Sequence, residues 1–77
     1  MNKQNRKDIE KLIEKLDEVK TDLEFMQEDE ESKYDNLPEG IQDSERGDAM
    51  QEAIEYLGYA VDSIDEAIDN LQTVVDQ

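Results

Sequence analysis

The chain has 77 residues, and its 23 acidic against 8 basic residues give a formal net charge of −15. A surface this acidic is repelled by DNA, RNA and anionic lipid, which argues against direct binding to any of them. The sequence contains no His, Cys or Trp, so it lacks the usual bases for nucleophilic catalysis and the usual ligands of transition metals. We therefore expect a single non-enzymatic domain over residues 1–77, with no cofactor and no metal.

We expect neither a transmembrane segment nor a leader peptide in this chain. No apolar run approaches the ~18 residues that span a bilayer, and no hydrophobic segment follows Met1. These features predict a cytoplasmic protein with no membrane association. A core at this length supplies roughly 3–5 kcal/mol, so we expect the chain to rely on a partner or on a second copy of itself.

The first predicted helix covers about residues 4–35. Its apolar residues alternate spacings of three and four, which is the pattern of a heptad seam. The seam consists of Ile9, Leu12, Leu16, Val19, Leu23 and Met26. Ile13 widens this stripe to one side, and Phe25 lies off it.

The predicted joint at residues 36–43 interrupts the periodicity. Pro38 disfavours helical backbone at the preceding residue, so the first helix should end near Asp35. Asp43 and Ser44 are both suitable N-caps for the second helix.

The second predicted helix covers about residues 44–76 and has a stricter seam. Spacings of four and three alternate without interruption through Met50, Ile54, Leu57, Val61, Ile64, Ile68, Leu71 and Val75. Beside this seam, small residues recur every seven positions at Ala53, Ala60 and Ala67, and Val74 continues the row. Small residues in such a row allow another backbone to come close.

Charge predicts how the two helices pair. Residues 1–20 carry a net charge of +1, whereas residues 47–77 contain eight acids and no Lys or Arg. Basic residues at the start of one helix and acids at the end of the other each oppose their own helix dipole. An antiparallel hairpin brings these two ends together, where their charges offset each other. Because each helix has more apolar face than one partner can cover, we expect the all-α hairpin to form a homodimeric four-helix bundle.

The leading candidate for a functional surface is the acidic second helix. It carries about one carboxylate per 6 Å, which is comparable to the phosphate spacing along a nucleic-acid strand. Two tyrosines beside Gly58 add a possible contact patch. The predicted partner-binding residues are Glu52, Glu55, Tyr56, Tyr59, Asp62, Asp65, Glu66 and Asp69.

Two functions follow from this surface. In the first, the acidic face imitates DNA, and the protein inhibits or modulates a basic protein that handles nucleic acid. In the second, the protein is a structural or adaptor coiled-coil homodimer, and its acids serve only solubility. The acidic run at residues 28–31 is not expected to bind a metal, because adjacent helical carboxylates point in different directions.

The stretch YDNLPEGIQDSERGDAMQEAIEYL at 34–57 resembles short acidic helical proteins of low-GC Gram-positive bacteria, their phages and mobile elements. Those proteins share a charged first helix, an NLPE...QxSERG joint and EAID-like heptads in the second helix. The resemblance implies a phage-like setting, and hence an inhibitor or adaptor acting on host nucleic-acid machinery. It also implies a specific structured joint, formed by Asn36, Leu37, Pro38, Ser44, Glu45, Arg46 and Gly47.

Overall fold

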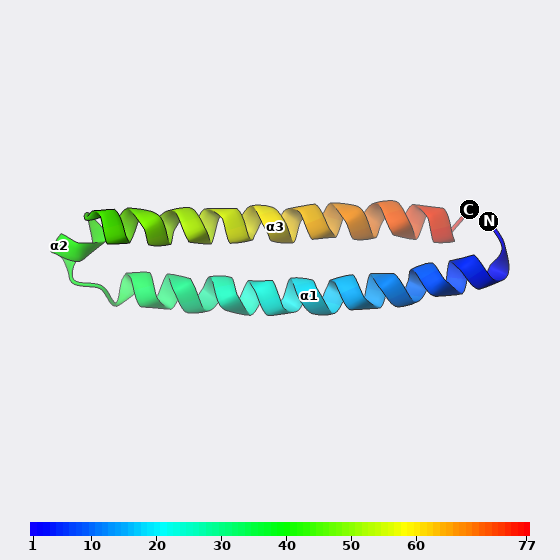
Figure 1. The fold of residues 1–77 in the computed structure, drawn as a ribbon, viewed down its shortest axis with the longest axis horizontal. Helices are drawn as coiled ribbons and strands as arrows, with labels where there is room; N and C mark the ends of the chain where they lie inside the picture. The colour runs from blue at the N-terminus through cyan, green and yellow to red at the C-terminus, as the bar shows by residue number, and fades with distance from the viewer.

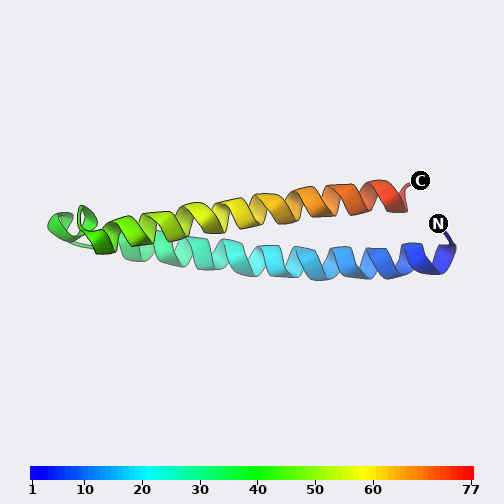
Figure 2. The same ribbon diagram turned by 45° about the horizontal axis from the view of Figure 1, so that its top comes forward.

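The computed structural model describes all 77 residues and contains three helices and no strand. The long helices α1 (Lys3–Asp35) and α3 (Glu45–Val75) are joined through the short helix α2 (Glu39–Gln42). α1 and α3 run antiparallel along an elongated molecule of 58 × 14 × 13 Å, with both chain ends at the end away from α2 (Figure 1). The view in Figure 2 shows the same side-by-side arrangement. The predicted all-α class is confirmed.

Both long helices are too polar to cross a membrane.

The start of α1 is capped by a side chain. Asn2 has an extended backbone, and its Oδ1 accepts a hydrogen bond from the backbone N–H of Asn5 at 2.7 Å. The cap satisfies one of the free N–H groups that every helix start exposes. At the other end, Lys33 is the basic residue of the last turn, where a positive charge complements the helix dipole.

The joint between the long helices is compact and hydrogen-bonded. Pro38 precedes α2, and the side chain of Gln42 then reaches back to the carbonyl oxygen of Tyr34 at 3.0 Å. Ser44 is the N-cap residue of α3, although its hydroxyl donates to the Ile41 carbonyl instead of capping the helix. The side chain of Gln42 in α2 therefore caps a carbonyl group in the last turn of α1.

The core is a single thin seam between α1 and α3. Val61 is the only buried large apolar side chain, and it remains 9% exposed. All the other predicted seam residues of α3 are half-buried, as a seam position against one partner helix should be.

The seam of α1 differs from the sequence prediction. The half-buried residues of α1 are Arg6, Ile9, Ile13, Leu16, Lys20, Leu23, Gln27, Glu30 and Tyr34. Leu12, Val19 and Met26 are 50%, 47% and 60% exposed, so they do not belong to the hairpin core. α1 is turned about its axis relative to the expectation, and polar side chains occupy positions where only apolar ones were expected.

Candidate functional site

Polar contacts along one edge of the hairpin align α1 with α3. Lys20 lies against Asp65, Gln27 against Gly58, and Tyr34 against Gln51. Each step of seven residues along α1 is matched by a step of seven in the opposite direction along α3. This regular spacing is that of an antiparallel heptad register.

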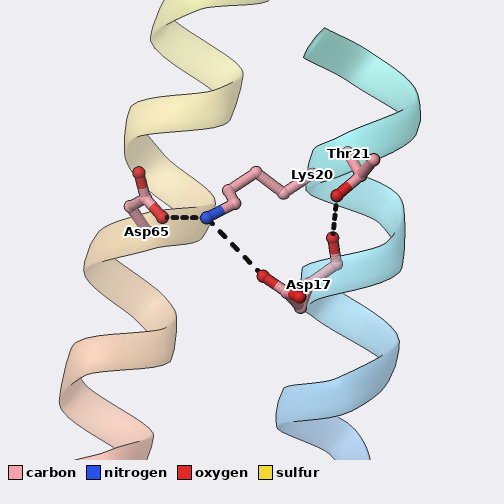
Figure 3. A network of polar contacts seen from close by, with 4 residues as sticks. All are labelled: Asp17, Lys20, Thr21 and Asp65. Atoms are coloured by element: carbon pink, nitrogen blue, oxygen red, sulfur yellow. Dashed lines mark hydrogen bonds and ion pairs between the residues drawn. The ribbon is translucent and has the colours of Figure 1, made fainter. Parts of the chain in front are cut away.

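Lys20 forms the ion pair that joins the two long helices. Its Nζ lies 2.8 Å from Oδ1 of Asp65 on α3 and 3.6 Å from Oδ1 of Asp17 on α1 (Figure 3). The hydrogen bond to Asp65 is the main cause that raises the pKa of Lys20, and the nearby charges of Asp65, Asp17 and Glu24 also raise it. Lys20 therefore stays protonated between carboxylates of both helices.

Gln27 makes the next contact along this edge. Its Nε2 donates to the backbone carbonyl of Ile54 at 3.1 Å. The approach is possible because Gly58 has no side chain: a Cβ there would lie 2.9 Å from Nε2 of Gln27. One heptad further, Nε2 of Gln51 donates to the hydroxyl of Tyr34 at 2.8 Å.

The opposite edge of the hairpin ends, near the joint, in an open depression of about 480 Å³. Its lining residues are Glu30, Lys33, Asn36, Leu37, Arg46 and Met50. Lys33 pairs with Asp29 at 3.0 Å, and this hydrogen bond raises the pKa of Lys33. Arg46 forms no ion pair. Because Lys33 and Arg46 line the same depression, they mark where this edge begins on α1 and on α3.

Residues seven apart lie on nearly the same face of a helix. Steps of seven from Lys33 back along α1 and from Arg46 forward along α3 therefore give the remaining residues of this edge. We call it the uncharged edge, and it consists of Leu12, Val19 and Met26 on α1 and of Ala53, Ala60, Ala67 and Val74 on α3. The adjacent row on α3 contains Ala49, Tyr56, Ser63 and Asn70, which are also uncharged. In a chain with 40% charged residues, this edge presents an apolar surface along both long helices.

The edge that carries Lys20 has the opposite character, and we call it the acidic edge. It consists of Glu10, Asp17, Glu24 and Glu31 on α1 and of Asp48, Glu55, Asp62, Asp65, Asp69 and Asp76 on α3. Except for Asp65, the members of each row recur every seven residues, or about 10.5 Å along a helix. Only Asp17 and Asp65 among them have a lysine partner. Most of the negative charge on this edge is therefore not neutralised within the chain.

The predicted partner-binding residues are all exposed, but they do not share one face. Four of them lie on the acidic edge, namely Glu55, Asp62, Asp65 and Asp69. Tyr56 borders the uncharged edge, and Glu52, Tyr59 and Glu66 lie on the side of α3 that points away from α1. Helix geometry thus divides the predicted patch among three surfaces.

The two tyrosines of the predicted contact patch pack on each other. Their rings meet edge to face, with centroids 5.6 Å apart and planes at 89°. The hydroxyl of Tyr59 donates to Oε1 of Glu55, and this hydrogen bond raises the pKa of Tyr59. Tyr56 and Tyr59 are 62% and 53% exposed, so neither is covered by the joint.

Sequence reasoning missed the polar residues of the α1 seam. Lys20, Gln27 and Tyr34 continue the heptad spacing of Ile13, which is a signal that a search for apolar positions does not detect. Gly58 is the matching signal on α3, since a glycine inside a helix often marks a close approach.

No group of three or more acidic side chains is placed to hold a metal ion. Comparisons with protein-family models, with curated proteins and with solved structures found no match to this chain.

Proposed function

We propose that the protein is a non-enzymatic helical interaction module that self-associates through the uncharged edge into a dimeric four-helix bundle. The uncharged edge is the observation that carries this proposal. Its α1 residues are large, apolar and about half exposed. Contiguous apolar surface rimmed by charge is typical of a surface that binds another protein.

The solvent-exposed area of the hairpin supports the proposal that a second copy covers the uncharged edge. The chain exposes 5746 Å², whereas an average monomer of 8.9 kDa exposes about 4,800 Å². The excess of about 900 Å² is close to the ~800 Å² that each partner buries in an interface of standard size. A second hairpin on the uncharged edge would bury an area of this order on each copy.

The uncharged edge is also suited to a second copy of itself. Its α1 side carries the large residues Leu12, Val19 and Met26, and its α3 side carries mainly alanines. Because both sides of the edge are uncharged, two copies can bury this edge against each other in a symmetric interface. Burying the exposed half of each large side chain contributes about 1 kcal/mol, so three from each copy give a substantial driving force.

The test compares two substitutions of exposed apolar residues by glutamate. Val19→Glu places a carboxylate in the middle of the uncharged edge, where burial without a partner costs several kcal/mol. Phe25→Glu is the matched control, because Phe25 is 64% exposed and lies on the face of α1 that points away from α3. Sedimentation equilibrium should show a dimer for the unchanged chain and for Phe25→Glu, and a monomer for Val19→Glu.

Circular dichroism should show the same helical content for both variants, since neither residue belongs to the hairpin core. A monomeric unchanged chain at micromolar concentration would overturn the proposal. Equal dissociation constants for the two variants would place the interface elsewhere.

The acidic edge favours a second function, which we propose alongside the first. The carboxylates form two rows on neighbouring helices, whose axes lie about 8–10 Å apart. Such rows suit the basic groove of a protein that handles nucleic acid, where they would take the place of phosphates. Self-association through the uncharged edge leaves the acidic edge accessible, so the two functions are compatible.

A further inference from the structure

α1 contains a second seam that overlaps the one it uses in the hairpin. Ile9, Leu16 and Leu23 face α3 but are only half-buried, and Leu12, Val19 and Met26 lie beside them on the uncharged edge. These six residues alternate spacings of three and four. They therefore form a complete coiled-coil seam on α1 that α3 covers only in part.

We infer that this seam pairs antiparallel with the same seam of a second copy, about a two-fold axis between Leu16 and Val19, and that reciprocal Lys15–Asp22 ion pairs align the two copies. The inference rests on the proposed self-association. In this register every residue of the seam has an apolar partner: Leu16 meets Val19, Leu12 meets Leu23, and Ile9 meets Met26 of the other copy.

The charges beside the seam support this register. Asp8, Lys15, Asp22 and Asp29 lie in one row next to the uncharged edge, at intervals of seven residues. Antiparallel helices bring equivalent flanking rows together, so Lys15 of each copy lies opposite Asp22 of the other. Asp8 lies opposite Asp29, whose charge Lys33 already offsets at 3.0 Å.

The distribution of charge along the hairpin also favours an antiparallel dimer. Residues 21–63, the half next to the joint, contain 14 acids and two basic residues, whereas the other half contains nine acids and six basic residues. A parallel dimer would place the two most acidic halves side by side. The antiparallel dimer places each beside the less acidic half of the other copy, which lowers the repulsion.

Lys33 and Arg46 add a local reason for the same orientation. They are the only basic residues in the half next to the joint, and both lie at the end of the uncharged edge. In a parallel dimer these cations would meet those of the other copy. In the antiparallel dimer Lys33 and Arg46 of one copy lie at the opposite end of the bundle from Lys33 and Arg46 of the other, so the cations of the two copies do not meet.

A charge-reversal cycle tests the alignment. Lys15→Glu alone and Asp22→Lys alone each replace two attractive contacts of the dimer by two repulsive ones. We expect each to raise the dimer dissociation constant about tenfold relative to its control, because exposed ion pairs contribute modestly and the symmetry doubles them. The double variant Lys15→Glu/Asp22→Lys restores both pairs, and its dissociation constant should return to within about threefold of the original.

The matched control is the same cycle at Lys11 and Glu18, which are also exposed and seven residues apart on α1. These two residues lie on the row that points away from α3, so Lys11→Glu and Glu18→Lys should act independently. Sedimentation equilibrium gives the dissociation constants for all six variants. A dimeric chain without coupling between positions 15 and 22 overturns the antiparallel alignment alone. A monomeric chain overturns the self-association on which it rests.

Discussion

Gly58 lies in the middle of α3, where glycine is about 1 kcal/mol less favourable than alanine. Its backbone does not adopt a positive φ, so the conformational freedom of glycine is not the reason for its presence. The reason is the amide of Gln27, which occupies the space of a Cβ and bonds to the carbonyl of Ile54. Gly58 thus lowers the helix propensity of α3 and allows a polar contact with α1.

The close approach of Gln27 to Gly58 predicts that these two residues are energetically coupled. Gly58→Ala alone should change the free energy of unfolding little, because the gain of about 1 kcal/mol in helix propensity is offset by a lost hydrogen bond of similar size. In a Gln27→Ala background the same change should stabilise the protein by about 1 kcal/mol, since no amide is displaced. Urea unfolding of the four proteins at one concentration measures this cycle. Equal effects of Gly58→Ala in both backgrounds would contradict the role given to Gln27.

At the scale of the secondary-structure elements, the packing of the joint between α1 and α3 depends on a single glycine. Gly47 lies in the first turn of α3, and a Cβ at this position would overlap the carbonyl oxygen of Gln42. The clash is with backbone atoms, which cannot move without shifting α2. Gly47 therefore sets how closely α2 packs against the start of α3.

Gly47→Ala should consequently destabilise the hairpin by about 1–3 kcal/mol, the usual cost of overpacking. Gly40→Ala is the control, because a Cβ at Gly40 in α2 would meet nothing within 4 Å. That change should be neutral or slightly stabilising, as alanine favours helix. Thermal unfolding followed by circular dichroism compares the two. If both variants melt alike, the close approach at Gly47 is not a constraint.

At the scale of the whole molecule, the hairpin has two edges of opposite character. The uncharged edge offers apolar contact to a second copy, and the acidic edge offers charge to a basic protein. Salt acts on these two interactions in opposite directions. It screens the repulsion between chains that each carry a net charge of −15, and it also screens the attraction between carboxylates and a basic partner.

The dimer dissociation constant should fall several-fold as ionic strength rises from about 0.01 to 0.15 M, because the Debye length shrinks from about 30 to 8 Å. The overall repulsion outweighs the few ion pairs between the copies. Sedimentation equilibrium at the two salt concentrations measures this effect. A dimer that weakens with salt would mean that attraction between charges, rather than apolar contact, holds it together.

The same salt increase should release any protein bound at the acidic edge, and duplex DNA should compete with that protein. Replacing Asp62 and Asp69 by Asn should weaken its capture, whereas replacing Glu52 and Glu66 by Gln should have less effect. Capture on the immobilised protein, followed by elution with duplex DNA, compares the two pairs. Equal capture by both variants at both salt concentrations would exclude a role for the acidic edge.

Sequence periodicity alone determines much of the fold. The interrupted pattern at Pro38 and Ser44 locates the joint, since a proline and a cap residue act on the backbone next to them. The α3 seam from Met50 to Val75 is predicted correctly because every one of its positions is apolar. Such features are local, so they can be derived without knowing what α3 packs against.

The tertiary structure alone determines how α1 is turned. Leu12, Val19 and Met26 fit the heptad pattern as well as Ile13, Lys20 and Gln27 do, and hydrophobicity favours the first set. The second set faces α3 because Asp65 offers Lys20 a counter-charge and Gly58 leaves space for Gln27 to reach the carbonyl of Ile54. Asp65 lies 45 residues from Lys20 in the sequence, and Gly58 lies 31 residues from Gln27. Only the folded chain brings these residues together, and in doing so it leaves an apolar seam exposed on the opposite edge.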